Sequence, residues 1–471
     1  MVTRAQTRPY SRDGFLYILS NKGEITLKKL DTLSIGLMLF SMFFGAGNLI
    51  FPPFLGAESG TSYWLAMSGF IITGVGLPFV VLLAVSLVKG GVQTIGNRVH
   101  PVFSTVFMVI IYLCIGPFLA IPRNATVAYE MSITPFLSES WRNSSLSLFL
   151  YTVIFFSLVY VISLNPSKME KYMGRWITPI LLLSMVILCA VGFVKLDAPF
   201  QSPSEAYQTG AFFKGFIEGY NTMDALAALA FGIVILTSIQ QRGVQDSKEL
   251  TEYTLKAGMI AGGLLALVYV SLGFIGGKMA ANGSFENGAD ILSSASTLLL
   301  GQSGTALLGF IFTLACFTTV VGLTTACGQY FSNLIPKASY KSVVFVVTLV
   351  GFILSNLGLN QILKVSVPFL VTAYPLTIVL ITLTFFSRFF KNSKKVYRSA
   401  MLFTGVFAVI GGFNAFGLDL GPLQTIRDIL PLSSVGLEWI VPALVGTAIG
   451  IVLSKLSKKQ DIPEQVDVKV S

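Results

Sequence analysis

The chain has little charge and long apolar stretches. Of its 471 residues, 11% are charged and 54% are hydrophobic, whereas soluble domains carry about 25% charged residues. Several runs of about 20 residues lack any charge, and this length crosses the ~30 Å hydrocarbon core of a bilayer. The composition excludes an ordinary soluble domain and predicts an all-α polytopic membrane protein surrounded by lipid.

The residues that most enzymes and metal sites use are also scarce. The one histidine, His100, lies in a short basic loop, and the four cysteines (Cys114, Cys189, Cys316 and Cys327) lie inside apolar runs. We expect free, buried thiols without disulfides or metal ligation. The sequence contains no Walker-type phosphate loop, HExxH or CxxC pattern. We therefore predict that the chain is not an enzyme and has no bound cofactor and no obligatory protein partner.

Positive charge is concentrated on one side of the predicted membrane domain. The net charge is +10, and 25 of the 32 Lys and Arg residues lie at the termini and in alternate loops, with only six on the opposite side. Because basic residues are retained in cytoplasmic loops, both termini are predicted to be cytoplasmic. This distribution also favours orientation signals over a nucleic-acid surface.

About 12 transmembrane helices are predicted within a single domain at residues 25–457. Residues 1–24 and 458–471 are predicted to be polar tails. The predicted spans are 33–55, 63–87, 102–127, 146–164, 174–194, 211–239, 254–276, 306–330, 342–358, 362–386, 399–416 and 438–456. In the longest outer loop, residues 291–300 form either a short helix or a plain connector.

The first span carries helix-weak residues in its middle. Gly45-Ala46-Gly47-Asn48 is followed by Pro52 and Pro53, and glycine and proline weaken a helical ladder. We predict two half-helices with an open turn, the alternative being a kinked but continuous helix. An open turn at membrane depth survives only inside protein or against a cavity, where its N–H groups can bind an anion and its carbonyls a cation.

The sixth span has a similar interruption. Gly219-Tyr220-Asn221-Thr222 is polar and helix-weak, and Asp224 follows. Interruptions in corresponding spans are typical of transporters built from inverted repeats. We predict a five-plus-five repeat, with repeat one at about 33–194, repeat two at about 211–386, and two extra helices at about 399–456.

Few ionisable residues lie within the spans, and such residues are costly enough to suggest function. Asp224 either holds a substrate ammonium, a cation or a transported proton, or it stabilises the N-terminus of the second half-helix. Arg123 and Glu218 are expected nearer the outer face, where they form an outer gate or extend to the interface.

The eighth span brings three oxygen-bearing residues together. Ala315, Thr318 and Thr319 place a carbonyl and two hydroxyls on one side of a helix. These oxygens are suitable ligands for a sodium ion. The alternative is that both hydroxyls bond back to their own helix.

Three segments carry a family resemblance. Phe40–Gly56 (FSMFFGAGNLIFPPFLG), Ile115–Glu130 (IGPFLAIPRNATVAYE) and Glu218–Leu229 (EGYNTMDALAAL) resemble the bacterial branched-chain amino-acid:cation symporters, the BrnQ-type or LIVCS family. The resemblance implies a LeuT-like fold of the APC superfamily and sodium-coupled import of Leu, Ile and Val across the bacterial cytoplasmic membrane.

The resemblance also implies roles for individual residues. The carbonyls of Ser41 and Phe44 and the oxygens of Ala315, Thr318 and Thr319 would hold sodium. The N–H groups of Gly47 and its neighbours would hold the substrate carboxylate. As our own hypothesis, we expect the substrate to contact Phe43, Gly45, Ala46, Gly47, Asn48, Tyr220, Asn221, Thr222 and Asp224, with Met223 beside its side chain. Asp224 has no counterpart that we can place in LeuT-type proteins. A proton-coupled transporter that uses Asp224, and less favourably an ion channel, are the alternatives.

Overall fold

The computed structural model describes residues 29–456 except 89, 143, 358 and 419–420. Within this part of the chain the regular structure is entirely helical. The predicted tails at 1–24 and 458–471 lie outside the described residues. All four cysteines are free, and all but Cys114 are buried.

Each predicted span lies on one helix or on consecutive helices, which confirms the fold class. The helices are α2 (Lys29–Phe43) with α3 (Ala46–Ser59), α4 (Tyr63–Ile71) with α5 (Leu77–Leu87), α7 (Pro101–Leu113) with α8 (Ala120–Ser132), α10 (Ser145–Ser163), α11 (Pro166–Tyr172) with α12 (Thr178–Lys195), α14 (Ala211–Glu218) with α15 (Asp224–Gln240), α16 (Ser247–Met279), α18 (Gln302–Leu334), α19 (Tyr340–Ser355), α20 (Leu359–Phe385), α21 (Lys394–Ala415) and α23 (Ile440–Leu456). Among the described residues, eight helices are long and apolar enough to cross a membrane, or nine if the bent α14–α15 pair counts as one span. The number of twelve crossings therefore stays a prediction.

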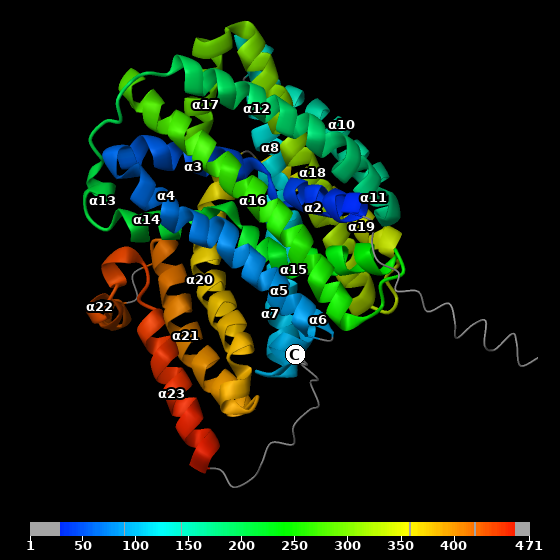
Figure 1. Ribbon diagram of the computed structural model, residues 1–471, viewed down its shortest axis with the longest axis vertical. Coiled ribbons are helices and arrows are strands. Elements are labelled where there is room, and N and C mark those ends of the chain that lie inside the picture. Colours follow the sequence, from blue (N-terminus) through cyan, green and yellow to red (C-terminus); the bar gives the residue numbers. More distant parts are fainter. Residues whose placement is uncertain (1–28, 89, 143, 358, 419–420, 457–471) are drawn as a thin grey trace, which may run out of the picture.

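Several of the connecting loops contain short helices. In Figure 1, α13 (Glu205–Gln208), α17 (Gly288–Leu300) and α22 (Pro422–Ile429) lie on the left, whereas α6 (Gly91–Asn97) and α11 lie on the right. The first three belong to loops predicted outside and the last two to loops predicted inside. The α17 helix confirms the short helix expected near 291–300. The sides of the membrane on which these loops lie stay a prediction.

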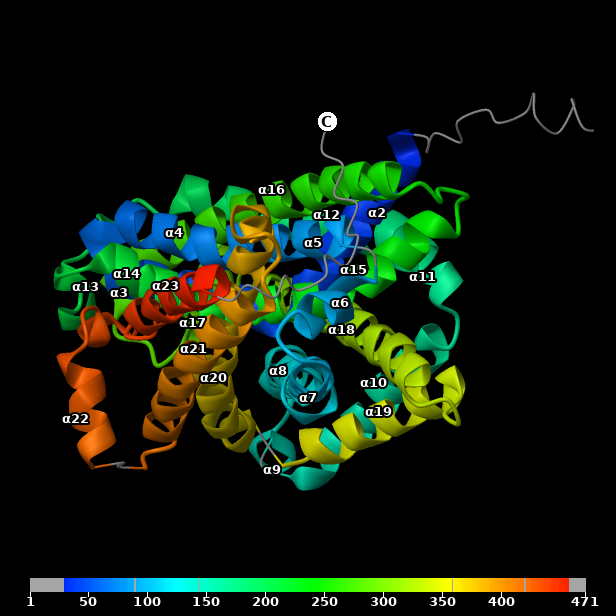
Figure 2. The same cartoon turned by 90° about the horizontal axis from the view of Figure 1, so that it is seen from below.

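The last helices of the chain form their own layer. Figures 1 and 2 show α20, α21 and α23 side by side at one edge of the bundle. Two glycines of α23 allow a close approach to α21, because a Cβ added to Gly450 would lie 2.6 Å from the Cα of Val396. The α21 and α23 helices correspond to the two extra helices predicted outside the ten-helix repeat, and they lie at the edge of the bundle. The repeat itself stays a prediction.

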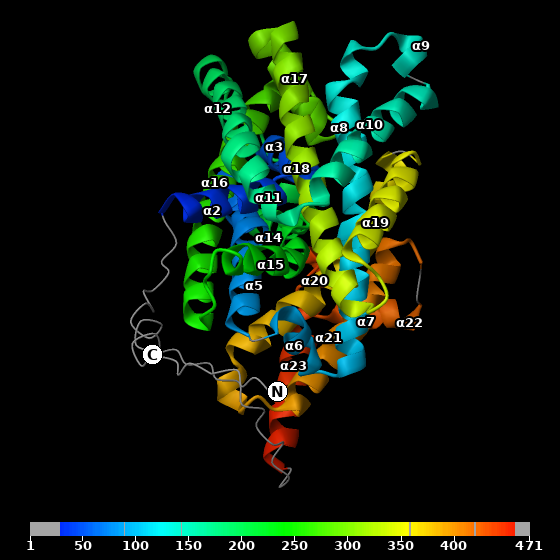
Figure 3. The ribbon, with the colours of Figure 1, turned by 90° about the vertical axis from the view of Figure 1, so that its right-hand side faces the viewer.

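One helix runs through the centre of the bundle. Figure 3 shows α18 between α12 and α19, and 67% of its most apolar segment is buried, the highest share among the membrane-crossing helices. Its neighbours include α2, α8 and α15. The predicted ion-binding residues of α18 therefore face other helices and not lipid.

Glycines set the spacing between α3 and α16. A Cβ on Gly56 would lie 1.8 Å from the carbonyl oxygen of Gly273, and one on Gly276 would lie 1.9 Å from the carbonyl oxygen of Pro53. Contacts this short with backbone leave no space for a methyl group. The α3 half-helix is therefore held by direct backbone contact with α16.

We expect Gly276→Ala to destabilise the protein by about 1–3 kcal/mol, because overpacking forces the two helices apart. Gly263→Ala is the matched control on the same helix, since no atom lies within 4 Å of the Cβ it would add. The measurement is thermal denaturation of the detergent-solubilised variants. Equal midpoints for the two variants would contradict this account of the α3–α16 contact.

Candidate functional site

The first predicted break is present. The α2 helix ends at Phe43 and α3 begins at Ala46, and Gly45 between them is extended (φ −123°, ψ −159°). The Gly45 N–H donates to Asn48 Oδ1 at 3.0 Å, and the Ala46 N–H donates to Asn124 Oδ1 at 2.8 Å. The alternative of a continuous first helix is wrong, and two side-chain amides replace the missing backbone acceptors.

The second predicted break is present too. Residues Gly219–Thr222 form a short 3-10 turn, and Met223 adopts a left-handed conformation with φ 67°. The axes of the helical segments before and after it differ by 42°. A positive φ is uncommon for a residue other than glycine, so the surrounding structure holds Met223 in this conformation.

A third break was not expected. The span predicted at 102–127 is interrupted over Cys114–Phe118, where Gly116 has non-helical angles (φ −90°, ψ −124°) before Pro117. The Gly-Pro pair was the available signal, because such dipeptides mark interruptions. This break directs the start of α8 toward the first break, which brings Asn124 to Ala46.

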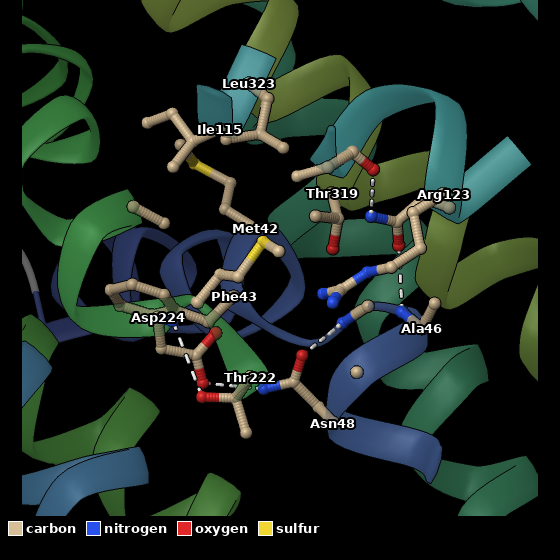
Figure 4. A pocket seen from close by; sticks show the side chains of 16 residues that line it. Met42, Phe43, Ala46, Asn48, Ile115, Arg123, Thr222, Asp224, Thr319 and Leu323 are labelled. Carbon is tan, nitrogen blue, oxygen red and sulfur yellow. Dashed lines mark hydrogen bonds between the residues drawn. The ribbon is translucent and has the colours of Figure 1, made fainter. Parts of the chain in front are cut away.

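A small cavity of about 20 Å³ lies where the three breaks meet. Figure 4 shows polar groups of Asn48, Thr222 and Asp224 on one side of it and the apolar side chains of Met42, Ile115 and Leu323 on another. Sixteen residues line the cavity: Met42, Phe43, Gly45, Ala46, Gly47, Asn48, Ile115, Ala120, Arg123, Asn124, Thr222, Met223, Asp224, Ala227, Thr319 and Leu323. Of the nine predicted substrate-binding residues, all but Tyr220 and Asn221 belong to this lining.

Asp224 joins the two broken helices. Its Oδ2 accepts from Asn48 Nδ2 at 2.6 Å and from the Tyr269 hydroxyl at 2.8 Å, and Asn48 Nδ2 also donates to the Tyr269 hydroxyl. Asp224 is buried, at 2% exposure. It also lies in the first turn of α15, where the helix dipole favours an anion. Its position agrees with the predicted role at the N-terminus of the second half-helix, and its carboxylate contacts the first broken helix as well. A role in holding a substrate ammonium, a cation or a proton stays a prediction.

Arg123 differs from its expected position. It is buried, at 4% exposure, and it lines the cavity instead of extending to the interface. Its Nη1 donates to the carbonyl oxygen of Asn221 at 3.3 Å, while Asn221 Nδ2 donates to Glu218 Oε2 at 2.8 Å. Glu218 itself pairs with Lys214 at 3.0 Å. Asn221 thus stands between the two residues of the predicted outer gate.

Tyr220 is directed away from the cavity. Its ring stacks on Tyr374 of α20, with ring centroids 4.3 Å apart. The Asn221 side chain points to Glu218, as described above. Tyr220 and Asn221 therefore do not line the cavity, whereas their neighbours Thr222 and Met223 do.

The predicted sodium ligands lie close to one another. The Ser41 carbonyl oxygen accepts from Thr318 Oγ1 at 2.9 Å and from Thr319 Oγ1 at 3.3 Å. Thr318 Oγ1 also lies 3.0 Å from the Ala315 carbonyl oxygen, and this is the bond back to its own helix that the alternative anticipated. Phe44 directly follows α2 and is one of the two residues that form the first break.

Two polar residues of the site were missed. Asn124 and Tyr269 are single polar side chains within apolar spans, and both are buried. The signal for Asn124 was its place in the quoted segment Ile115–Glu130. Nothing in the sequence indicated that the Tyr269 hydroxyl reaches Asp224, because this contact depends on how α16 lies against α15.

Known proteins are similar to this chain along most of its length. Residues 28–457 match the family described as branched-chain amino acid transport protein. The branched-chain amino acid permease BraB of Bacillus subtilis is 44% identical, with 90% of this chain and 95% of the relative covered. The branched-chain amino acid transport system 2 carrier protein of Pseudomonas aeruginosa is 40% identical, with 92% and 98% covered.

Solved structures share the fold at low sequence identity. Mhp1, a nucleobase-cation-symport-1 family transporter, is 14% identical with a TM-score of 0.58, and the alignment covers 90% of this chain and 92% of Mhp1. MhsT in complex with L-phenylalanine is 16% identical with a TM-score of 0.54, covering 90% and 98%. These likenesses bear on the fold, whereas the matches along the sequence establish that the chain is a multi-pass membrane protein of the branched-chain amino acid transport protein family.

Proposed function

We propose that the chain imports leucine, isoleucine and valine together with sodium, by alternating access to the cavity between the broken helices. The main observation in support is that one break, at Phe44–Gly45, adjoins both the cavity and the oxygen cluster of Ser41, Thr318 and Thr319. A single change in the angle between α2 and α3 would then act on both ligands. The substrate leaves chemically unchanged.

The cavity has suitable groups for both charges of an amino acid. The first-turn N–H groups of α3 at Gly47 and Asn48 have no acceptor within their own helix, and a helix N-terminus favours an anion. Arg123 Nη2 lies so close that a Cβ on Gly47 would be 2.9 Å from it. We assign the substrate carboxylate to this corner and the ammonium to Asp224.

The oxygen cluster suits a monovalent cation. The α2 helix ends at Phe43, so the carbonyls of its last turn lack helical partners. The Gly45 N–H, which would continue the helix by bonding to Ser41, donates to Asn48 instead. The Ser41 carbonyl is thereby left to the hydroxyls of Thr318 and Thr319, and sodium bound there would replace these hydrogen bonds.

We place the exit path for the substrate on the side of the cavity that is predicted to be cytoplasmic. A second, wider cavity is lined by Gly90 and Gly91 in a predicted inner loop and by Leu229, two residues beyond Ala227 of the first cavity. The rings of Tyr112 and Tyr330 stack at its wall with centroids 3.9 Å apart. We assign this cavity as the inner vestibule through which the substrate leaves.

A sodium gradient supplies enough free energy to accumulate a neutral amino acid inside the cell. One charge moving through ~100 mV gains about 2.3 kcal/mol, and a tenfold concentration ratio adds about 1.4 kcal/mol. The sum of roughly 3.7 kcal/mol supports about 500-fold accumulation of a neutral amino acid. Since one methylene group changes discrimination by only ~1–3 kcal/mol, such a site accepts several branched side chains.

Proton coupling through Asp224 is the second candidate. The observation that favours it is a buried carboxylate bonded to Asn48 and Tyr269 at the junction of the two broken helices. Buried carboxylates at such positions are typical of proton relays. The two candidates differ in which gradient drives uptake.

We expect an imposed inward sodium gradient to drive concentrative uptake of labelled leucine into proteoliposomes, because sodium binding stabilises the substrate-bound site. Potassium in place of sodium should abolish accumulation, and unlabelled isoleucine and valine should compete. Uptake that persists without sodium and collapses with a protonophore would instead support coupling through Asp224.

Thr318→Ala and Thr319→Ala should each raise the sodium concentration for half-maximal leucine uptake by about tenfold, equivalent to ~1.4 kcal/mol of lost cation binding. Thr313→Ala is the matched control, because its hydroxyl bonds back to the Gly309 carbonyl of the same helix at 2.8 Å. The measurement is initial uptake against sodium concentration. A sodium requirement that is equal in all three variants would refute the assigned ion site.

A further inference from the structure

An open groove lies between α2 and α16, away from the cavity of the broken helices. The two helices pack against each other (Figure 1). The groove has a volume of about 520 Å³, and its lining consists of Lys29, Thr32, Leu33, Tyr253, Lys256, Met259 and Ile260. Three of these residues belong to the first two turns of α2, and four belong to the N-terminal half of α16. Both segments begin on the side of the membrane that is predicted to be cytoplasmic, so the groove lies at that boundary.

The chemistry of the lining changes along the groove. Each helix contributes one lysine, Lys29 from α2 and Lys256 from α16, and the apolar residues Leu33, Met259 and Ile260 follow them in the sequence. On both helices the cation is therefore nearer the predicted cytoplasmic side, and the apolar residues are nearer the membrane centre. Leu33 is 44% exposed and Met259 is 53% exposed, so the apolar part of the groove is open to the molecules that surround the bundle.

Direct contact between the two helices closes the apolar end of the groove. A Cβ on Gly36 would lie 2.8 Å from the Cβ of Ile260, so α2 and α16 touch there without space for a methyl group. From Lys29 to Gly36 the groove extends roughly 10 Å along α2, which is less than the ~15 Å half-thickness of a hydrocarbon core. It can therefore hold the upper part of a lipid whose remaining chain stays in the bilayer.

The charges around the groove favour an anion. Among the described residues, no carboxylate forms an ion pair with Lys29. Lys256 pairs with Glu252 at 2.6 Å, but both side chains are exposed, and an exposed pair contributes little free energy. The other carboxylate close by in the sequence of α2 is Asp31, which two arginines engage at 3.1 and 3.0 Å. Both lysines are thus able to bind an added negative charge.

We propose that this groove binds one anionic phospholipid of the cytoplasmic leaflet. Its phosphate lies between Lys29 and Lys256, and the upper part of one acyl chain lies along Leu33, Met259 and Ile260. Basic residues between transmembrane helices on the cytoplasmic side suit anionic headgroups, and the apolar lining favours a lipid over a soluble anion. The bound lipid joins α16 to the inner half of the first broken helix. The inference depends neither on the transported substrate nor on the coupling ion.

Titration of the delipidated, detergent-solubilised full-length protein with phosphatidylglycerol tests this assignment. Native mass spectrometry counts the bound lipids and gives the dissociation constant of the first one. We expect phosphatidylglycerol to bind more tightly than phosphatidylcholine, which has no net charge. Lys29→Gln and Lys256→Gln should each weaken phosphatidylglycerol binding by about fivefold, the contribution of one basic residue at an anionic membrane surface, and the double variant by about 30-fold.

A matched control separates the groove from general surface charge. Lys248→Gln removes the same charge from the same helix outside the groove, and it should leave the affinity for phosphatidylglycerol unchanged. Glycerol phosphate and inorganic phosphate, which lack acyl chains, should not displace the lipid at equal concentration. Equal affinities of the double variant and of Lys248→Gln would overturn the inference, and so would displacement by either soluble phosphate. All three lysines are exposed, so these variants should keep the wild-type denaturation midpoint in the absence of lipid.

Discussion

Hydrocarbon offers no hydrogen-bond partner to a broken helix, and this constraint organises the structure. Exposing the backbone groups freed at Gly45 and Met223 to lipid would cost several kcal/mol for each group. Both breaks therefore lie inside the bundle. Side-chain amides complete the first break, because Asn48 and Asn124 accept from the N–H groups of Gly45 and Ala46. Breaks that are enclosed in this way also leave polar backbone around a cavity, which is what a binding site inside a membrane needs.

The two breaks are held together by one polar cluster. Asp224 begins the second half of one broken helix and accepts from Asn48 in the first turn of the other, while Tyr269 of α16 donates to the same oxygen. The α16 helix also contacts α3 through glycines whose spacing allows no methyl group. A movement of α3 therefore changes the hydrogen bonds of Asp224 and the α3–α16 contact at the same time.

Both predicted breaks could be located from the sequence, because glycine, proline and polar residues weaken a helix through their own backbone properties. The positions of Thr318 and Thr319 on the same side of α18 could also be predicted, since they follow from the spacing of residues along a helix. The position of Arg123 could not be read in this way. Sequence suggested a residue near the outer face, but the unexpected break at Gly116 redirects α8 and buries the guanidinium beside Gly47. The same tertiary dependence explains why Tyr220 stacks on Tyr374 and why Tyr269 was missed.

The arrangement also gives a physical reason for coupling between an ion and a substrate. Thr319 lines the cavity and at the same time bonds to the Ser41 carbonyl in the last turn of α2. A cation bound to that carbonyl would fix the end of α2 and thereby the position of Gly45 and the α3 N-terminus, which are the groups proposed to hold the carboxylate. Linkage requires the effect to be reciprocal, so a bound amino acid must strengthen cation binding by the same factor. Coupling of this kind needs no long pathway, because the two sites are separated by a single turn of broken helix.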